Sequence, residues 1–396
     1  AALLPDDSVI VAGRDTRGMF LRKITKDGKP DTSYGVDGKF QPTYSILGQV
    51  AAYEEPFAIG ALPDGRALLG MRSFKAPPNQ AGVQIASANG QTLTPVRSIP
   101  TEFATIWSIS HAGGSRWLAT GMRNVSVDRE ETFGGGFVVA AIDVDRNELD
   151  TSWGNVAQYQ ISPGITPAPG VVQGTWLVIS QSAGDGYTVV PTANQLWLLG
   201  DSMAARGRYA NLGVGKLTFA GKFSTDYGGG YGLNYWELDA PFIGAVPVGG
   251  DSFVVAGIRR DSFVMRKFDN GEGDAVFGIR TLAVPGLAVS GGPRTAATRT
   301  RGFTRDGSGY LFAGDGFNAG AAAAILVRAT GSGNIDTSFG ANGIVYRSAP
   351  QGRATVTNRV LTQRSGRILL VSGDVPASDG ATGGAVVTAH WPSLQR

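Results

Sequence analysis

The sequence predicts an all-β fold, a seven-bladed β-propeller with four-stranded antiparallel blades. Three observations predict it: a motif that recurs seven times, several short apolar segments within each repeat, and a composition rich in glycine. The 58 glycines and 20 prolines among 396 residues indicate many turns, and 42% hydrophobic residues allow a large core. Helical periodicity is absent, so the apolar segments are best read as strands.

Each repeat begins with a head, which is a turn followed by a short apolar strand that ends in glycine. The first two heads run over Leu4–Gly13 and Leu62–Gly70. The other five are His111–Gly121, Val190–Gly200, Val246–Gly257, Thr304–Gly314 and Thr362–Gly373. A further apolar strand follows the head, as in Met19–Ile24, and its β-branched and aromatic residues suit a sheet.

A tail motif closes most repeats. It reads Asp-Thr-Ser-aromatic-Gly at 31–35, 150–154 and 336–340, and it is altered at 224–228 and 274–278. The second repeat has residues 90–94 in its place, and no tail follows the seventh head. A short apolar segment after the tail and another before the next head bring each repeat to four strands in about 50 to 60 residues, the size of a propeller blade.

Blades of this kind are expected to stack, because a four-stranded sheet cannot bury both of its apolar faces alone. We therefore expect one propeller domain over residues 1–396. Its repeats would span 1–50, 51–102, 103–162, 183–238, 239–287, 299–348 and 356–396.

The Leu-Pro-Asp-Gly element at 62–65, the Val-Ala-Gly element at 11–13 and the Asp-Thr-Ser-Phe-Gly element at 336–340 resemble bacterial delta-60 repeat proteins. The resemblance covers nearly the whole chain and implies a propeller-like repeat fold. Members of that family are of largely unassigned function, so the resemblance implies no activity.

The two ends of the blades differ in their connections. Turns between strands one and two and between strands three and four are compact, as in Pro63-Asp64-Gly65. The opposite connections are long and irregular, and include 71–82, 122–136, 162–185, 201–213, 285–301 and 374–384. Long loops on a rigid scaffold commonly carry recognition, which places a ligand site at this end.

Charged and aromatic residues at this end form the predicted site, around the mouth of the channel that a propeller encloses. They could bind a polar or anionic ligand, although strand ends also carry charges that are only solvated. The predicted ligand-binding residues are Arg14, Glu55, Arg123, Asp201, Arg206, Tyr209, Asp239, Arg301, Asp315, Arg359 and Asp374.

Chemical motifs are scarce. Gly200-Asp201-Ser202-Met203 is similar to the nucleophile block of GDSL-type hydrolases, but only His111 and His390 could serve as a base, and Val387 stands where the acid before His390 belongs. Asp143, Asp145 and Asn147 have the spacing of calcium ligands, without the glycine and the closing acid of such a loop. We therefore expect no resident metal or cofactor, with calcium at these three residues as the alternative.

Composition excludes some partners. A formal net charge of +3 without a basic stretch argues against nucleic acid, and no run of about 18 apolar residues predicts a membrane span. Absent cysteines exclude disulfides, and the chain opens within a repeat, as a secreted bacterial product without its leader would.

We expect a secreted or envelope-associated binding module for a protein, peptide or glycan, rather than an enzyme. The alternatives are a propeller lyase, hydrolase or esterase with its site at the channel mouth, and a structural subunit of a surface assembly. The sequence predicts no oligomeric state.

Overall fold

A computed structural model describes most of the chain and divides it into two compact units. The described residues are 1–15, 18–42, 45–46, 49–50, 55–72, 81–99, 104–126, 133–154, 168–175, 184–202, 211–238, 240–259, 261–287, 302–349, 353–376 and 384–390. The N-terminal unit comprises Ala2–Glu237 and Gly249–Asp251; the C-terminal unit comprises Ala1, Leu238–Val248 and Ser252–Arg396.

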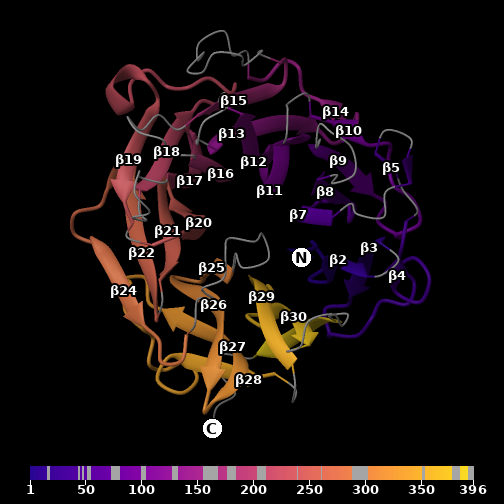
Figure 1. The fold of residues 1–396 in the computed structure, drawn as a ribbon, viewed down its shortest axis with the longest axis vertical. Coiled ribbons are helices and arrows are strands. Elements are labelled where there is room, and N and C mark those ends of the chain that lie inside the picture. Colours follow the sequence, from indigo (N-terminus) through magenta and orange to yellow (C-terminus); the bar gives the residue numbers. More distant parts are fainter. Residues whose placement is uncertain are drawn as a thin grey trace. The chain divides into compact units, whose positions relative to one another are not determined.

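The N-terminal unit contains four antiparallel sheets in chain order (Figure 1). Sheet 1 has β1 (Ala2–Leu3), β2 (Val9–Asp15), β3 (Gly18–Ile24) and β4 (Lys39–Phe40); sheet 2 has β7 (Glu55–Ala61), β8 (Ala67–Arg72), β9 (Ala81–Ala86) and β10 (Arg97–Ser98). Sheet 3 has β11 (Ala104–Gly113), β12 (Arg116–Ser126), β13 (Phe133–Asp143), β14 (Glu148–Leu149) and β15 (Val171–Thr175). Sheet 4 has β16 (Gly184–Pro191), β17 (Leu196–Ser202), β18 (Asn211–Leu217) and β19 (Leu233–Glu237), and a small hairpin joins β5 (Ser45–Ile46) to β6 (Gln49–Val50).

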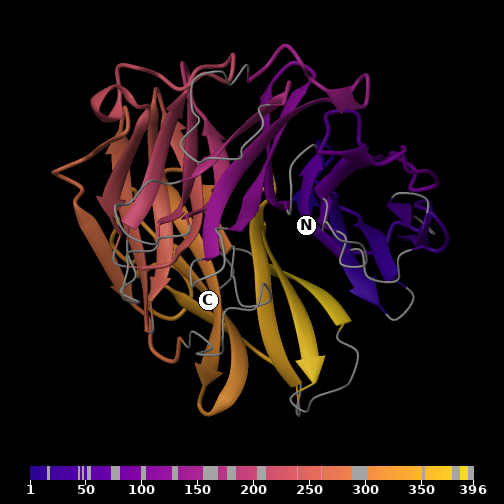
Figure 2. The same ribbon diagram turned by 45° about the horizontal axis from the view of Figure 1, so that its top comes forward.

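The C-terminal unit contains three sheets. Sheet 5 has β20 (Phe242–Gly249), β21 (Ser252–Arg259), β22 (Ser262–Asp269), β23 (Glu272–Gly273) and β24 (Ile279–Ala283). Sheet 6 has β25 (Gly302–Asp306), β26 (Gly309–Asn318), β27 (Ala321–Ala329) and β28 (Ile344–Ser348). Sheet 7 has β29 (Arg353–Thr362), β30 (Ile368–Pro376) and β31 (Gly384–His390), which lie side by side in yellow in Figure 2.

The chain is a β-propeller, but the predicted number of blades is wrong. In the part of the chain that the structure describes, six sheets have four or five strands, and sheet 7 has three. The difference lies in the seventh repeat, because a complete blade needs a fourth strand paired to the third, and among the described residues no strand pairs with the outer edge of β31. The propeller therefore has six four-stranded blades, and seven repeat heads do not mean seven complete blades. The prediction of a single domain over 1–396 stays a prediction.

Adjacent sheets within each unit pack face to face, and this explains why the central strands are apolar throughout. On β13, Val138 and Ala140 join the core shared with sheet 2, while Phe137 and Val139 join the core shared with sheet 4. Alternate side chains on a strand point to opposite faces, so a strand covered on both faces has no polar side. The continuous apolar run of this strand follows from its position between two sheets.

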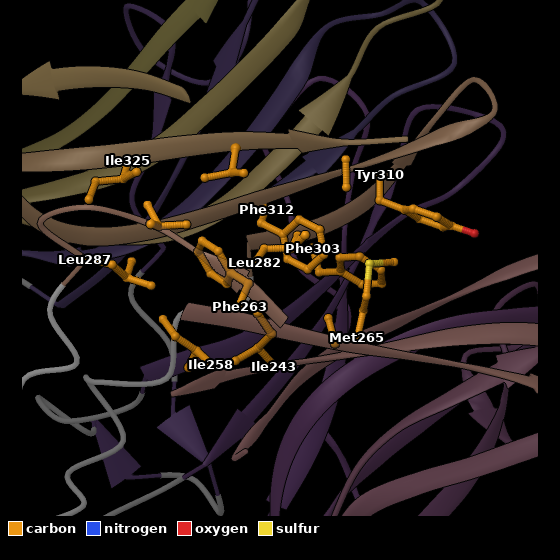
Figure 3. Close-up of a cluster of buried hydrophobic side chains, with 14 of the residues drawn as sticks. Ile243, Ile258, Phe263, Met265, Leu282, Leu287, Phe303, Tyr310, Phe312 and Ile325 are labelled. Atoms are coloured by element: carbon orange, nitrogen blue, oxygen red, sulfur yellow. The ribbon is translucent and has the colours of Figure 1, made fainter. Parts of the chain in front are cut away.

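The largest core of the C-terminal unit lies between sheets 5 and 6 (Figure 3). Phe263 and Met265 on β22 meet Phe303 on β25 and Phe312 on β26, and all four are buried. The rings of Phe263 and Phe312 lie 5.0 Å apart between centroids. Aromatic contacts of this kind hold the two sheets in a fixed relation, which matters for the hollow that lies beside them.

The fold contains almost no helix. Among the described residues the helical element is the short 3₁₀ turn at Gly228–Gly230. None of the described residues form a helix that is long and apolar enough to cross a bilayer.

Candidate functional site

Each sheet has a short-turn end, where strands one to two and three to four are joined. In sheet 2 the backbone N–H of Leu62 donates to the carbonyl of Arg66 at 2.9 Å. In sheet 6 the turn after β27 is closed by the N–H of Thr330, which donates to the carbonyl of Asn334 at 2.8 Å. The backbone groups of these turns are thus satisfied locally. The opposite end of each sheet carries the remaining connections, which we call the long-connection end.

The tail motif occupies the short-turn end and has a structural role. In the first tail, Asp31 Oδ1 accepts a hydrogen bond from the Ser33 hydroxyl at 2.6 Å, and Asp31 Oδ2 lies 3.1 Å from Lys23 Nζ. The corresponding ion pairs in other sheets are Arg116–Asp150 at 2.6 Å, Lys216–Asp226 at 2.8 Å, Lys267–Asp274 at 2.8 Å and Arg328–Asp336 at 3.6 Å. The aspartate therefore fixes the tail to the third strand or a neighbouring strand of its own sheet.

The aromatic residue of the tail fixes one sheet to the next. Trp153 is fully buried, and its ring packs so closely on Gly221 of sheet 4 that a Cβ there would lie 2.5 Å from the ring. The N–H of Gly154 also donates to the carbonyl of Ala220 at 3.0 Å. Tyr34 packs on Gly90 and Phe277 on Gly333 in the same manner. The most regular sequence motif of this chain is thus explained by packing between sheets.

We expect the tail aspartates to make the stability of the fold depend on pH. Hydrogen bonding from the serine hydroxyl is the main cause that holds the pKa of Asp31 and of Asp336 below the ordinary value of 3.8. A carboxyl whose pKa is lowered by folding stabilises the folded state when it is ionised. That stabilisation is complete above the ordinary pKa and disappears as the pH falls through the lowered, folded-state pKa.

We expect Asp31→Asn to lower the free energy of unfolding at pH 7 by about 1–2 kcal/mol, because a charge-assisted hydrogen bond and an ion pair are lost. The difference from the unmodified protein should shrink once the pH drops below about 4 and vanish at lower pH. Urea denaturation followed by circular dichroism between pH 2 and pH 7 measures this difference in the free energy of unfolding and its dependence on pH. The control is Asp27→Asn, since Asp27 is 68% exposed in its side chain. A difference that persists unchanged at pH 2 would contradict this assignment.

Seven of the predicted ligand-binding residues lie in described strands. Arg14 is in β2, Glu55 begins β7, Arg123 is in β12, Asp201 is in β17, Asp315 is in β26, Arg359 is in β29 and Asp374 is in β30. Six of them lie toward the long-connection end of their strands, and their role in binding stays a prediction. Arg359 lies inside its strand, because β29 runs from Arg353 to Thr362. Arg206, Tyr209, Asp239 and Arg301 lie outside the described residues, so their placement stays a prediction.

Two of these residues have described surroundings. Asp315 Oδ1 accepts a hydrogen bond from the backbone N–H of Thr357 at 2.7 Å, and the Thr357 hydroxyl donates to the carbonyl of Gly314 at 3.1 Å. Asp315 therefore ties sheet 6 to the β-bulge between Thr357 and Arg359 in β29. Arg359 is half-buried, and burial lowers the pKa of its guanidinium. Asp315 thus has a structural contact that sequence reasoning did not anticipate.

The three residues that were the alternative calcium ligands already have hydrogen-bond or ion-pair partners within the chain. Asp143 Oδ1 accepts hydrogen bonds from the backbone N–H groups of Asp145 at 3.0 Å and Arg146 at 3.2 Å. Asp145 lies 3.3 Å from Arg66, and Asn147 accepts a hydrogen bond from Thr94 at 3.1 Å. Over the described ranges, no three His, Cys, Asp or Glu residues gather as a metal would require. Calcium binding here stays a prediction to be tested by titration.

The histidines do not assemble a hydrolase site in the described structure. His111 is exposed, its Nε2 lies 3.0 Å from the carbonyl oxygen of Gly114 in its own turn, and its ring lies 4.9 Å from that of Trp117. His390 lies in β31 opposite Ile368. Ser202 ends β17 opposite Gly184, within an ordinary strand pair.

A hollow of about 430 Å³ lies between sheets 5 and 6 at their short-turn end, where the sequence predicted no site. Lys267, Asp274, Val276, Arg280, Arg305 and Tyr310 are among its lining residues. Hydrogen bonding to Asp274 is the main cause that raises the pKa of Lys267, so this pair stays fully ionised. The altered fifth tail, Asp-Ala-Val-Phe-Gly at 274–278, is the sequence signal that could have pointed here.

Comparisons with known proteins add information about the fold alone. Neither a protein-family model nor a curated protein matches this sequence. Among solved structures, a proposed 6-phosphogluconolactonase from Bacteroides uniformis is similar with a TM-score of 0.50 and 11% identity, over 97% of this chain and 95% of that one. Hydrazine synthase from Kuenenia stuttgartiensis is similar with a TM-score of 0.50 and 10% identity, over 100% and 95%. At such identities the likeness carries no substrate or activity to this chain.

Proposed function

We propose that this chain is a delta-60-type repeat propeller that acts as an extracellular or envelope-associated binding module. Its ligand, a protein, peptide or glycan, would contact the long-connection end of the sheets. The connections that would make this contact include residues 127–132 and 203–210, which lie outside the described residues.

One observation supports the proposal: the two ends of the sheets are used differently. At the short-turn end, the turns are closed by their own backbone hydrogen bonds, and the tail residues are occupied by contacts that hold sheets together. Residues that make such structural contacts cannot be replaced freely to form a binding site. The length differences among repeats are concentrated at the opposite end, where the scaffold tolerates them.

Arrays of acidic and neutral oligosaccharides and of peptides, probed with the full chain, test this proposal. We expect binding that is lost when Asp128 to Glu131, or Arg206 to Tyr209, are replaced by alanine. The control replaces the exposed Lys26 and Asp27 in a short turn, and it should bind as the unmodified protein does. The proposal fails if no probe binds, or if both loop variants bind as well as the control.

The envelope or extracellular location is tested separately, by fractionating the source cells and detecting the chain with an antibody. Recovery in the cytoplasmic fraction alone would contradict it.

A further inference from the structure

The hollow between sheets 5 and 6 contains one ion pair that belongs to the repeat and two cations that do not. Lys267 pairs with Asp274 as Lys23 pairs with Asp31 in sheet 1. Asp274 Oδ1 accepts backbone hydrogen bonds from Val276 and Phe277 at 2.9 and 3.0 Å, so both carboxylate oxygens have partners. These two charges cancel and serve the fold. The charge that needs an explanation is that of Arg280 and Arg305.

Arg280 stands at a position that is apolar in most other sheets. It lies opposite Met265 in the register of sheet 5. The same register position is held by Phe40 in sheet 1, Arg97 in sheet 2, Val172 in sheet 3, Asn234 in sheet 4 and Val345 in sheet 6, so it is apolar in three of these five sheets. The repeat fold therefore does not require a cation there. An arginine that departs from the structural pattern of its repeat is a candidate for function.

Arg305 is a second departure on the facing sheet. It lies opposite Tyr310 in the register of sheet 6. The same register position is held by Leu3 in sheet 1, His111 in sheet 3, Pro191 in sheet 4 and Leu361 in sheet 7. Two arginines that the repeat does not explain thus line one hollow from two different sheets.

Within the part of the chain that the structure describes, neither arginine forms an ion pair with a carboxylate. Arg305 Nε donates to the carbonyl of Gly307 at 3.0 Å, and Arg280 donates to the carbonyl of Val276 at 3.4 Å. The charged side chains that line the hollow therefore sum to an excess of two positive charges.

Packing holds Arg280 in place before any ligand arrives. Its guanidinium lies over the ring of Phe277, 5.6 Å from the ring centroid, and its Cγ packs against Gly333 of sheet 6. A guanidinium that is already ordered loses less conformational entropy when it binds an anion. Tyr310 lines the same hollow opposite Arg305, and burial raises the pKa of its phenol, which leaves a neutral hydroxyl donor at physiological pH.

We propose that this hollow binds a small acidic ligand, whose carboxylate or phosphate group is held by Arg280 and Arg305. Guanidinium groups suit both anions, because their N–H donors match two oxygens at once. The volume of about 430 Å³ falls within the range of small-ligand sites. The exposed Val276, 91% accessible, provides an apolar surface at the rim for the remainder of the ligand. This site lies at the short-turn end, so it is independent of the function proposed above.

The test is calorimetric titration and thermal melting of the full chain with inorganic phosphate, D-glucuronate and uncharged D-glucose at constant ionic strength. We expect at least one anion to bind and to raise the melting temperature, while glucose does neither. Binding of phosphate alone identifies a phosphate site, and binding of glucuronate alone a carboxylate site. The double variant R280Q and R305Q should bind the anion at least about ten-fold more weakly.

Two further variants separate binding from folding. Arg280→Lys keeps the charge and the aliphatic stem but loses the planar donor pair, so it should bind with intermediate affinity. Arg146→Gln removes an exposed arginine of sheet 3, 78% accessible in its side chain, and should bind like the unmodified protein. The proposal is overturned if neither anion binds, if the double variant binds undiminished, or if Arg146→Gln weakens binding equally.

Discussion

Replacing Trp153 by alanine should lower the free energy of unfolding of the N-terminal unit by about 3–5 kcal/mol. The indole is fully buried between sheets 3 and 4, within a core that includes Phe137, Phe223 and Leu233. Because Trp153 packs against the backbone at Gly221, the neighbouring sheet cannot move in to fill the space. Urea denaturation followed by circular dichroism measures the change without relying on the removed fluorophore.

Two controls make this prediction specific. Trp153→Phe should cost less than the alanine variant, because Phe277 and Phe339 fill the corresponding position in sheets 5 and 6. Tyr231→Ala removes a ring that is 67% exposed and should change stability by less than about 0.5 kcal/mol. Equal losses for Trp153→Ala and Tyr231→Ala would show that the tail aromatic does not hold the sheets together.

Replacing Gly121 by alanine should cost about 3 kcal/mol or more, and it is the second change with a large expected effect. Gly121 ends the head of the third repeat and lies opposite Ile106, beside the β-bulge of β11 between Ile106 and Ser108. A Cβ at this position would overlap the backbone carbonyl oxygen of Thr105. The strand β11 would have to shift, because a backbone atom cannot rotate away as a side chain does.

A matched glycine distinguishes this overlap from a general effect of substitution. At Gly244 in β20 the nearest atom to an added Cβ is the Cβ of Phe303, at 3.3 Å. Gly244→Ala should therefore cost no more than about 1 kcal/mol, since a contact of 3.3 Å is relieved by a small shift, whereas the overlap at Gly121 is not. Thermal unfolding of both variants provides the comparison, and equal shifts in melting temperature would refute the assignment of Gly121 to a backbone contact.

Much of the fold could be predicted because the residues that indicate each strand lie within the same repeat. The glycine that ends a head, the apolar strand after it and the tail turn are local features, and β2, β8, β12, β17, β21, β26 and β30 lie where the heads place them. The blade count could not be read in the same way. A head predicts the start of a sheet, but it does not predict whether a fourth strand pairs with the third, and the described part of the seventh repeat pairs only three strands.

The candidate sites show the same limit. Asp315 was predicted as a ligand residue from its place after a head glycine, yet it accepts a hydrogen bond from Thr357, a partner 42 residues away. Arg280 and Arg305 were not singled out as a pair, because they lie in different repeats and meet only when sheets 5 and 6 pack. Sequence spacing gives no measure of a distance that packing creates.

The sequence by itself determined the all-β class, the position of the strands within each repeat and the two kinds of connection, because hydrophobic alternation and turn residues act over a few neighbours. Only the tertiary structure decided how many sheets have a fourth strand. It also decided which aspartates hold a tail to its sheet through ion pairs, and which arginines have no carboxylate partner among the described residues. Those properties depend on contacts between sheets, where burial and hydrogen bonding join residues far apart in the chain.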